Sequence, residues 1–110
     1  MIIEIKNKNI IHIFPSESII YCKAEGNYTS YVLEDKKVLS YQTLKNTYDN
    51  LPSCDFCRCH NSFIVNLSKI RVFDTHKNIL ILKDKLFVPV SNRRKKVLQH
   101  ALKLFIRYNS

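Results

Sequence analysis

The alternation of apolar and polar residues along the chain predicts a mainly β protein. Short runs rich in Ile, Val, Leu, Tyr and Phe recur at even intervals, and Asn, Asp, Ser and Lys separate them. This pattern is typical of antiparallel strands joined by short turns. No long helical pattern separates successive runs, so a parallel βαβ arrangement is not expected. We predict strands near residues 2–6, 9–14, 18–23, 27–33, 37–41, 56–65, 69–73, 78–83 and 86–90.

Two segments follow a helical period instead. Residues 43–51 place Leu44, Thr47, Tyr48 and Leu51 on one face, and Pro52 ends the segment. Ser91 stands at the N-cap position of a second helix over residues 92–108. That helix carries an apolar stripe made of Val97, Leu98, Ala101, Leu102, Phe105 and Tyr108. The predicted fold is therefore elongated and all-antiparallel, with short strands, one short internal helix and a C-terminal helix.

Length and composition limit the possible classes of protein. A chain of 110 residues is typical of one domain, so we predict a single domain over residues 1–110. No apolar run approaches the ~20 residues of a membrane-spanning helix. Residues 1–5 have the pattern of a strand and not of a signal peptide. We therefore expect a cytoplasmic protein with reduced cysteines.

The chain is strongly basic, with 18 Lys and Arg residues against 9 Asp and Glu residues and a formal net charge of +9. Such an excess indicates the kind of partner and not the fold. The candidates are nucleic acid, an anionic membrane surface and an acidic protein. A proteome that is generally rich in Lys and Asn would explain the same excess without any partner.

Residues 56–66 contain the most informative pattern. Arg58, His60, Asn61 and Ser62 bring a cation, an imidazole, an amide and a hydroxyl into a run that otherwise reads as a strand. A purely structural strand would alternate apolar residues with less specialised polar ones. In a basic chain, this pattern favours a surface that binds a polyanion and reads bases.

A second basic feature opens the predicted C-terminal helix. Arg93, Arg94, Lys95 and Lys96 crowd its first turn, where each exposed cation opposes the helix dipole at a cost of roughly 0.3–1 kcal/mol. Free backbone N–H groups at the same end would assist phosphate binding. The alternative interpretation is a solvated basic face.

The cysteines are compatible with a metal site but favour a core role. Cys54, Cys57, Cys59 and His60 lie within seven residues, whereas structural zinc sites usually take ligand pairs from separate segments. A strand would place Cys57 and Cys59 on one face and His60 on the other. A redox Cys-x-x-Cys motif normally opens a helix, which this segment does not. We therefore interpret Cys57 and Cys59 as small core residues, with a zinc or redox protein as an alternative.

No enzyme site stands out in the sequence. Gly26 is the only glycine, so a Gly-rich phosphate loop cannot form. His60 with Cys57 or Cys59 could be a base and a nucleophile, but no orienting partner is identifiable. We expect no catalytic activity, no cofactor and no bound metal.

Four motifs occur in the order found in a known family. The first spans residues 19–28 and is similar to the pattern I-Y-I-E-A-x-G-N-Y. The second is Thr43-Leu44-Lys45 followed by Leu51-Pro52. The third, and most specific, is Phe56-x-Arg58-x-His60-x-Ser62-Phe63-Ile64-Val65-Asn66, and the fourth is Val88-Pro89-Val90-Ser91-Asn92-Arg93. Over residues 10–102 the chain resembles the LytTR family of DNA-binding domains, the output modules of many bacterial response regulators.

This resemblance implies sequence-specific binding of double-stranded DNA by loops that enter successive major grooves, in a transcription regulator that binds direct repeats as two copies. The implied base contacts are Tyr28, Asn61 and Arg93. Asn can bond bidentately to adenine and Arg to guanine, each pair discriminating by about 1–3 kcal/mol. Arg58 and His60 belong to the family pattern, with a DNA contact and a structural role both open. The predicted phosphate contacts are Asn27, Ser62, Lys69, Ser91, Arg94, Lys95 and Lys96.

Other partners follow from the same resemblance. They are a second copy on the adjacent repeat, a receiver domain of a two-component system, and the transcription machinery. No membrane partner is expected. The alternative to DNA binding is a membrane-surface or protein-interaction module that uses the basic helix 92–108 as an amphipathic anchor. The apolar stripe of that helix could pack on the sheets or serve self-association.

Overall fold

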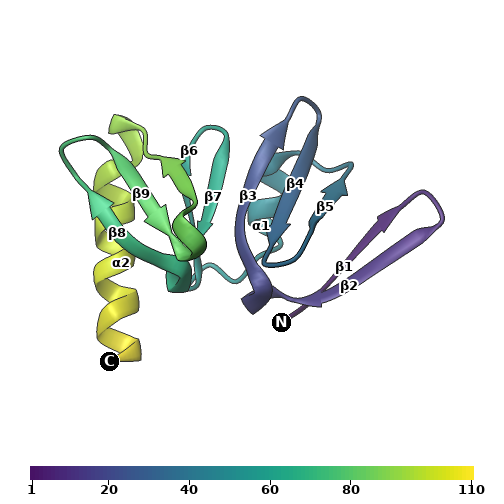
Figure 1. Cartoon of the computed structure of the whole chain (residues 1–110), viewed down its shortest axis with the longest axis horizontal. Helices are drawn as coiled ribbons and strands as arrows, with labels where there is room; N and C mark the ends of the chain where they lie inside the picture. Colours follow the sequence, from purple (N-terminus) through teal and green to yellow (C-terminus); the bar gives the residue numbers. More distant parts are fainter.

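A computed structural model describes residues 1–110, which form three antiparallel sheets and two α-helices (Figure 1). A hairpin consists of β1 (Ile2–Asn7) and β2 (Ile10–Pro15). The central sheet has the order β5-β4-β3-β7-β6, formed by β3 (Ile19–Glu25), β4 (Tyr28–Leu33), β5 (Lys37–Ser40), β6 (Phe56–His60) and β7 (Phe63–Asn66). The third sheet contains β8 (Ile70–Asp74), β9 (Ile79–Leu82) and β10 (Phe87–Pro89). The helices are α1 (Leu44–Asp49) and α2 (Lys95–Asn109).

The predicted fold class is confirmed. The molecule is elongated, with extents of 43 × 30 × 25 Å, and every sheet is antiparallel. Apart from residues 56–65, each predicted strand lies within two residues of its predicted bounds. Short 3-10 turns occur at η1 (Ser16–Ser18), η2 (Leu67–Lys69), η3 (Lys83–Lys85) and η4 (Asn92–Arg94). Neither α1 nor α2 combines the length and the apolar character that a membrane-spanning helix needs.

The central sheet separates two hydrophobic cores because successive side chains of a strand point to opposite faces. On one face, Phe56 and Ile64 pack with side chains of the β1–β2 hairpin and of α1, such as Phe14 and Leu44. The other face packs against the three-stranded sheet and α2. Its side chains include Cys57, Cys59, Val65, Leu80, Val88 and Leu98. The core positions predicted for Cys57 and Cys59 are thus confirmed.

The predicted strand over residues 56–65 is wrong, because this segment forms the β6–β7 hairpin. Phe56 pairs with Asn66, and His60 pairs with Phe63, so Asn61 and Ser62 form the turn. Both residue types favour turns, but without Gly or Pro they extend the polar alternation of a strand. In the hairpin both side chains lie at an edge of the molecule and not in the middle of a sheet.

The predicted start of the last helix is also wrong. The 3-10 turn η4 occupies residues 92–94, and α2 begins at Lys95. The Ser91 hydroxyl makes no capping hydrogen bond; instead the Ser91 carbonyl oxygen accepts one from the Arg94 N–H at 3.1 Å. By contrast, Thr43 caps α1, since its hydroxyl accepts a hydrogen bond from the Asn46 N–H at 3.1 Å.

Candidate nucleic-acid interface

Three loops gather at one edge of the molecule, the upper edge in Figure 1. They are the β3–β4 turn, the β6–β7 turn and the segment of residues 91–94 after β10. Two backbone hydrogen bonds fix their neighbourhood. The Ala24 N–H donates to the Ser62 carbonyl at 2.9 Å, and the Ser91 N–H donates to the Cys59 carbonyl at 3.0 Å. The structure thus brings the predicted base contacts Tyr28, Asn61 and Arg93 to a single edge.

Arg58 and His60 hold the β6–β7 turn in shape. The Arg58 Nη2 donates to the Asn61 carbonyl at 2.8 Å, and the His60 Nδ1 accepts from the Ser62 N–H at 3.1 Å. The His60 ring also packs edge-on against Phe63, with ring centroids 5.7 Å apart. Both residues therefore have a structural role at the turn, and the exposed Asn61 side chain has no hydrogen-bond partner within the protein.

Three arginines form an uncompensated positive cluster beside this turn. Burial, followed by the charges of Arg94 and Arg93, lowers the pKa of the Arg58 guanidinium from its ordinary value. None of the ion pairs in the structure involves these arginines. Like charges held together without a carboxylate repel one another, so the cluster favours binding of an anion.

Unpaired polar atoms concentrate at the same place. Four buried side-chain atoms in the protein lack a hydrogen-bond partner, namely Arg58 Nε, Asn78 Oδ1, Ser91 Oγ and Arg94 Nε. Asn78 belongs to this region because its Nδ2 donates to Asn92 Oδ1 at 2.6 Å. Each unpaired buried group costs about 1–3 kcal/mol. Such a concentration is typical of a site whose partner is a ligand.

The predicted phosphate contacts differ in their surroundings. Lys96 and Asn27 are exposed, and Ser62 lies in the β6–β7 turn. The ammonium group of Lys95 donates to the Thr75 carbonyl, so this lysine joins the start of α2 to the β8–β9 turn. Arg94 and Ser91 are half-buried and contribute the unpaired atoms described above.

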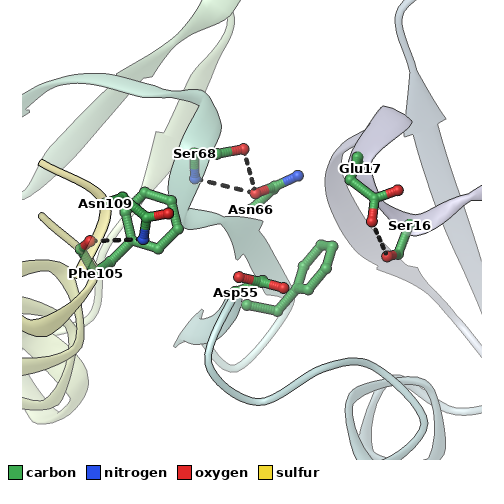
Figure 2. A pocket seen from close by; sticks show the side chains of 8 residues that line it. Ser16, Glu17, Asp55, Asn66, Ser68, Phe105 and Asn109 are labelled. Carbon is green, nitrogen blue, oxygen red and sulfur yellow. Dashed lines mark hydrogen bonds between the residues drawn. The ribbon is translucent and has the colours of Figure 1, made fainter. Parts of the chain in front are cut away.

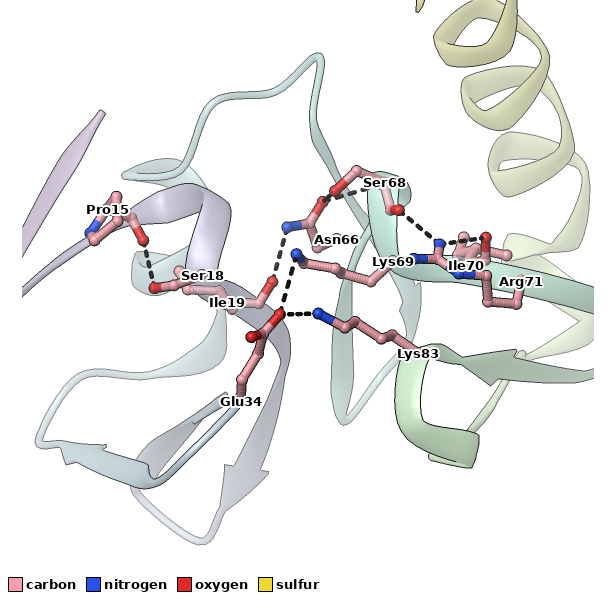
Figure 3. A network of polar contacts seen from close by, with 10 residues as sticks. All are labelled: Pro15, Ser18, Ile19, Glu34, Asn66, Ser68, Lys69, Ile70, Arg71 and Lys83. Atoms are coloured by element: carbon pink, nitrogen blue, oxygen red, sulfur yellow. Dashed lines mark hydrogen bonds and ion pairs between the residues drawn. The ribbon is translucent and has the colours of Figure 1, made fainter.

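Lys69 is not part of this edge. It lies in η2, where its Nζ is 3.7 Å from Glu34 Oε1, and Lys83 Nζ pairs with the same oxygen (Figure 3). These ion pairs join the β4–β5 turn to η2 and η3, at the end of the molecule opposite the three loops (Figure 1). The structure therefore does not bring Lys69 together with the other predicted phosphate contacts.

Two residues at the edge were not among the predicted contacts. Tyr41 packs edge-on against Tyr28, with ring centroids 4.9 Å apart, and the two side chains are 47% and 42% exposed. Lys23 pairs opposite Phe63 in the sheet, and its Nζ lies 6.0 Å from the centre of that ring. The available signal for Tyr41 was an aromatic residue at the end of the predicted strand 37–41, but its contact with Tyr28 depends on the β4–β5 register.

The cysteines do not form a metal centre in the structure. No group of three or more His, Cys, Asp or Glu side chains comes together in an arrangement that could hold a metal ion. Burial raises the pKa of the Cys57 thiol to about 11 and of the Cys59 thiol to about 12, whereas Cys54 is exposed. Cys57 and Cys59 are therefore stabilised as neutral core thiols.

Comparison with known proteins identifies the family. A sequence model of the LytTr DNA-binding domain matches residues 9–103. The chain belongs to the LytTr DNA-binding domain family. The resemblance inferred over residues 10–102 is thereby confirmed. The fold agrees as well: this LytTr domain is similar to the LytTr DNA-binding domain of a Bacillus cereus protein described as a methyl-accepting/DNA response regulator. The TM-score is 0.80 at 27% identity, over 92% of this chain and 95% of the other.

Curated relatives of this LytTr domain are named as transcriptional regulatory proteins. It is 36% identical to NatR of Bacillus subtilis over 72 residues, which are 66% of this chain and 31% of NatR. It is 34% identical to YpdB of Escherichia coli K12 over 104 residues, which are 91% of this chain and 42% of YpdB. The chain thus spans less than half the length of these two relatives.

Proposed function

We propose that this LytTr domain binds double-stranded DNA in a sequence-specific manner as part of a bacterial transcription regulator. The observation that carries the proposal is the loop edge itself. It brings the exposed side chains of Tyr28 and Asn61 together with an arginine cluster without counter-charges and with all four unpaired buried polar atoms. Family membership and the names of the relatives support the same function.

Reading of bases is assigned to three exposed residues on separate elements. Asn61 presents an amide from the β6–β7 turn, Arg93 a guanidinium from η4, and Tyr28 a hydroxyl from the start of β4. The amide suits adenine and the guanidinium suits guanine in the major groove. Because the loops lie side by side on one edge, we propose that they enter successive major grooves.

Phosphate contacts surround these readers in the proposed complex. Asn27, Ser62, Ser91, Arg94 and Lys96 would set the register on the duplex without reading sequence, and Lys95 would orient the loops. Binding of phosphate oxygens near Arg94 and Ser91 would also supply partners for atoms that are unpaired in the free protein. This role explains why the chain tolerates an arginine cluster without carboxylates.

The proposal extends to assembly and to cellular context. Two copies would bind direct repeats, either as a stand-alone regulator or as the output part of a response regulator with a receiver domain. The proposed function consists of DNA binding alone, so it requires neither a catalytic site nor a cofactor. Such a regulator acts where bacterial DNA lies, in the cytoplasm, and through contact with the transcription machinery.

Selection from a randomised duplex library tests this proposal. The purified protein is incubated with the library at near-physiological salt in the presence of competitor DNA, because non-specific binding is strongly salt-dependent. Enrichment of a repeated motif is the expected result, and its length reports whether one or two copies bind. Salt-sensitive binding without enrichment of any motif would reduce the function to non-specific polyanion binding and contradict the proposal.

A further inference from the structure

The outer surface of α2 leaves apolar side chains uncovered. Only Leu98 of its 15 residues is fully buried. Val97 and Tyr108, which lie on the same side of the helix, are 62% and 79% exposed. Single exposed apolar residues are ordinary, but several along one side of a helix beside a groove are typical of an interaction surface.

Such a groove runs along one side of α2 and has a volume of about 560 Å³. Val97, Ala101, Leu104 and Tyr108 form its wall on the helix, and Leu67 of η2 contributes to the opposite side. The four helix positions are spaced by four, three and four residues. This is the spacing at which side chains of two packed helices interdigitate. The groove therefore has the shape of a binding site for another helix.

A basic ridge accompanies the groove along the solvent side of α2. His100, Lys103 and Arg107 are all exposed and lie on one helical face, adjacent to the apolar wall. The helix contains no Asp or Glu, and the ion pairs of the structure include none of the ridge residues. The uncompensated charge of Lys103 and Arg107 complements carboxylates on the flank of a bound helix.

The opposite rim of the groove has the opposite sign. Asp55 lines the groove and also a neighbouring pocket of about 190 Å³, which contains Glu17. Figure 2 shows Asp55 between Glu17 and the end of α2, where Phe105 and Asn109 lie. A bound helix would therefore carry its carboxylates on the flank that faces the ridge and not on the flank that faces Asp55. The two rims define both the chemistry and the orientation of the partner.

We propose that the α2 groove binds an acidic amphipathic helix of another protein. Its apolar side chains enter between Leu67 and the wall formed by Val97 and Leu104, and its carboxylates face Lys103 and Arg107. A second copy of α2 does not fit this role, because two basic ridges would repel each other. A flat anionic membrane matches the ridge but not a groove with an acidic rim.

The groove can be occupied while the loop edge is bound to DNA. η4 and the first turn of α2 lie at the loop edge, and the helix then runs away from it toward the opposite end of the molecule (Figure 1). Lys103 and Arg107 lie on this distant part. The proposed partner is therefore independent of the DNA-binding proposal, and either can fail without the other.

Two synthetic peptides with the same leucine pattern at helical spacing provide the test. One carries Glu along a single flank, and the other carries Lys at those positions. Fluorescence anisotropy of the labelled peptides measures binding to the full chain. We expect saturable binding of the Glu peptide only, weakened about tenfold by the double variant Lys103→Glu/Arg107→Glu. The control Lys36→Glu/Lys37→Glu makes the same charge change at two exposed positions, the end of the β4–β5 turn and the first residue of β5, and should leave the affinity within about twofold.

Val97→Ser tests the apolar wall at a side chain that is 62% exposed, so the fold should tolerate it. It should weaken binding of the Glu peptide while thermal unfolding stays unchanged. Equal binding of the two peptides, or equal losses in the ridge variant and its control, would overturn the proposal. Binding to phosphatidylglycerol vesicles without binding of the Glu peptide would overturn it in favour of a membrane surface. Dimerisation that Val97→Ser abolishes, without peptide binding, would overturn it in favour of a second copy.

Discussion

Asn61→Ala separates recognition of DNA from stability of the fold. Asn61 lies at the tip of the β6–β7 turn, and its side chain is exposed. Its carbonyl oxygen accepts the hydrogen bond from Arg58, whereas the side-chain amide has no partner within the protein. The substitution keeps the backbone acceptor and removes only the amide, so it removes the proposed base contact without disturbing the turn.

The two expected magnitudes differ clearly. Loss of an exposed side chain without partners should change the free energy of unfolding by less than about 0.5 kcal/mol. Loss of a bidentate contact to adenine should weaken binding to the specific site by about 1–3 kcal/mol, which is about 5-fold to 150-fold in the dissociation constant. Non-specific binding should stay nearly unchanged, because it depends on phosphate contacts.

Fluorescence anisotropy with the selected duplex and with a scrambled duplex measures the ratio of specific to non-specific affinity, and urea denaturation measures stability. Asn9→Ala is a matched control, since Asn9 is an exposed asparagine in the β1–β2 turn, remote from the loop edge. Arg93→Ala should lower the affinity ratio to a similar extent. If both Asn61→Ala and Arg93→Ala leave the ratio unchanged, the assignment of the readers is wrong.

Three further predictions concern the rest of the chain. Lys96→Ala should weaken specific and non-specific binding alike and reduce the slope of log affinity against log salt by about 0.9; an unchanged slope would exclude a phosphate contact. Asn66→Ala should lower the free energy of unfolding by about 1–3 kcal/mol in urea titrations, because the buried Asn66 Nδ2 donates to the Ile19 carbonyl at 2.7 Å; a loss below about 0.5 kcal/mol would contradict this. The buried thiols Cys57 and Cys59 have raised pKa values, so their contribution to stability should be complete below the ordinary thiol pKa of about 8.5 and fall as pH rises toward the folded-state values. Replacing both by Ala should reduce the loss of stability at alkaline pH, measured as the free energy of unfolding at a series of pH values. An unchanged pH profile would contradict this prediction.

The sequence predicted most elements because their local signals agree with their packing. Alternating apolar residues gave nearly every strand, and Thr43 with Leu44 and Thr47 marked α1, where the cap and the buried face are both present in the structure. The β6–β7 hairpin was not predicted, because Asn61 and Ser62 continue the polar alternation of the strands beside them. The place of β7 in the sheet depends on its pairing with β3, which is distant in sequence. No local sequence pattern indicates this pairing.

The candidate site was predictable in its residue types but not in its arrangement. The family motifs indicated Asn61 and Arg93, and the structure brings both to one edge. Lys69 differs from the basic residues of that edge only through its pairing with Glu34, which is 35 residues away in sequence. Tyr41 becomes a neighbour of Tyr28 through the β4–β5 register. Contacts between residues so distant in sequence depend on the complete topology.

The two backbone hydrogen bonds that tie the loops together have a consequence for evolution. The Ala24–Ser62 and Ser91–Cys59 bonds involve only main-chain atoms, so they persist whatever side chains the tips carry. Asn61 and Arg93 can therefore mutate to other polar residues without loss of the scaffold, since neither supports it. A lineage could retarget such a regulator to new promoters through single substitutions at the tips, and each intermediate would remain a folded protein.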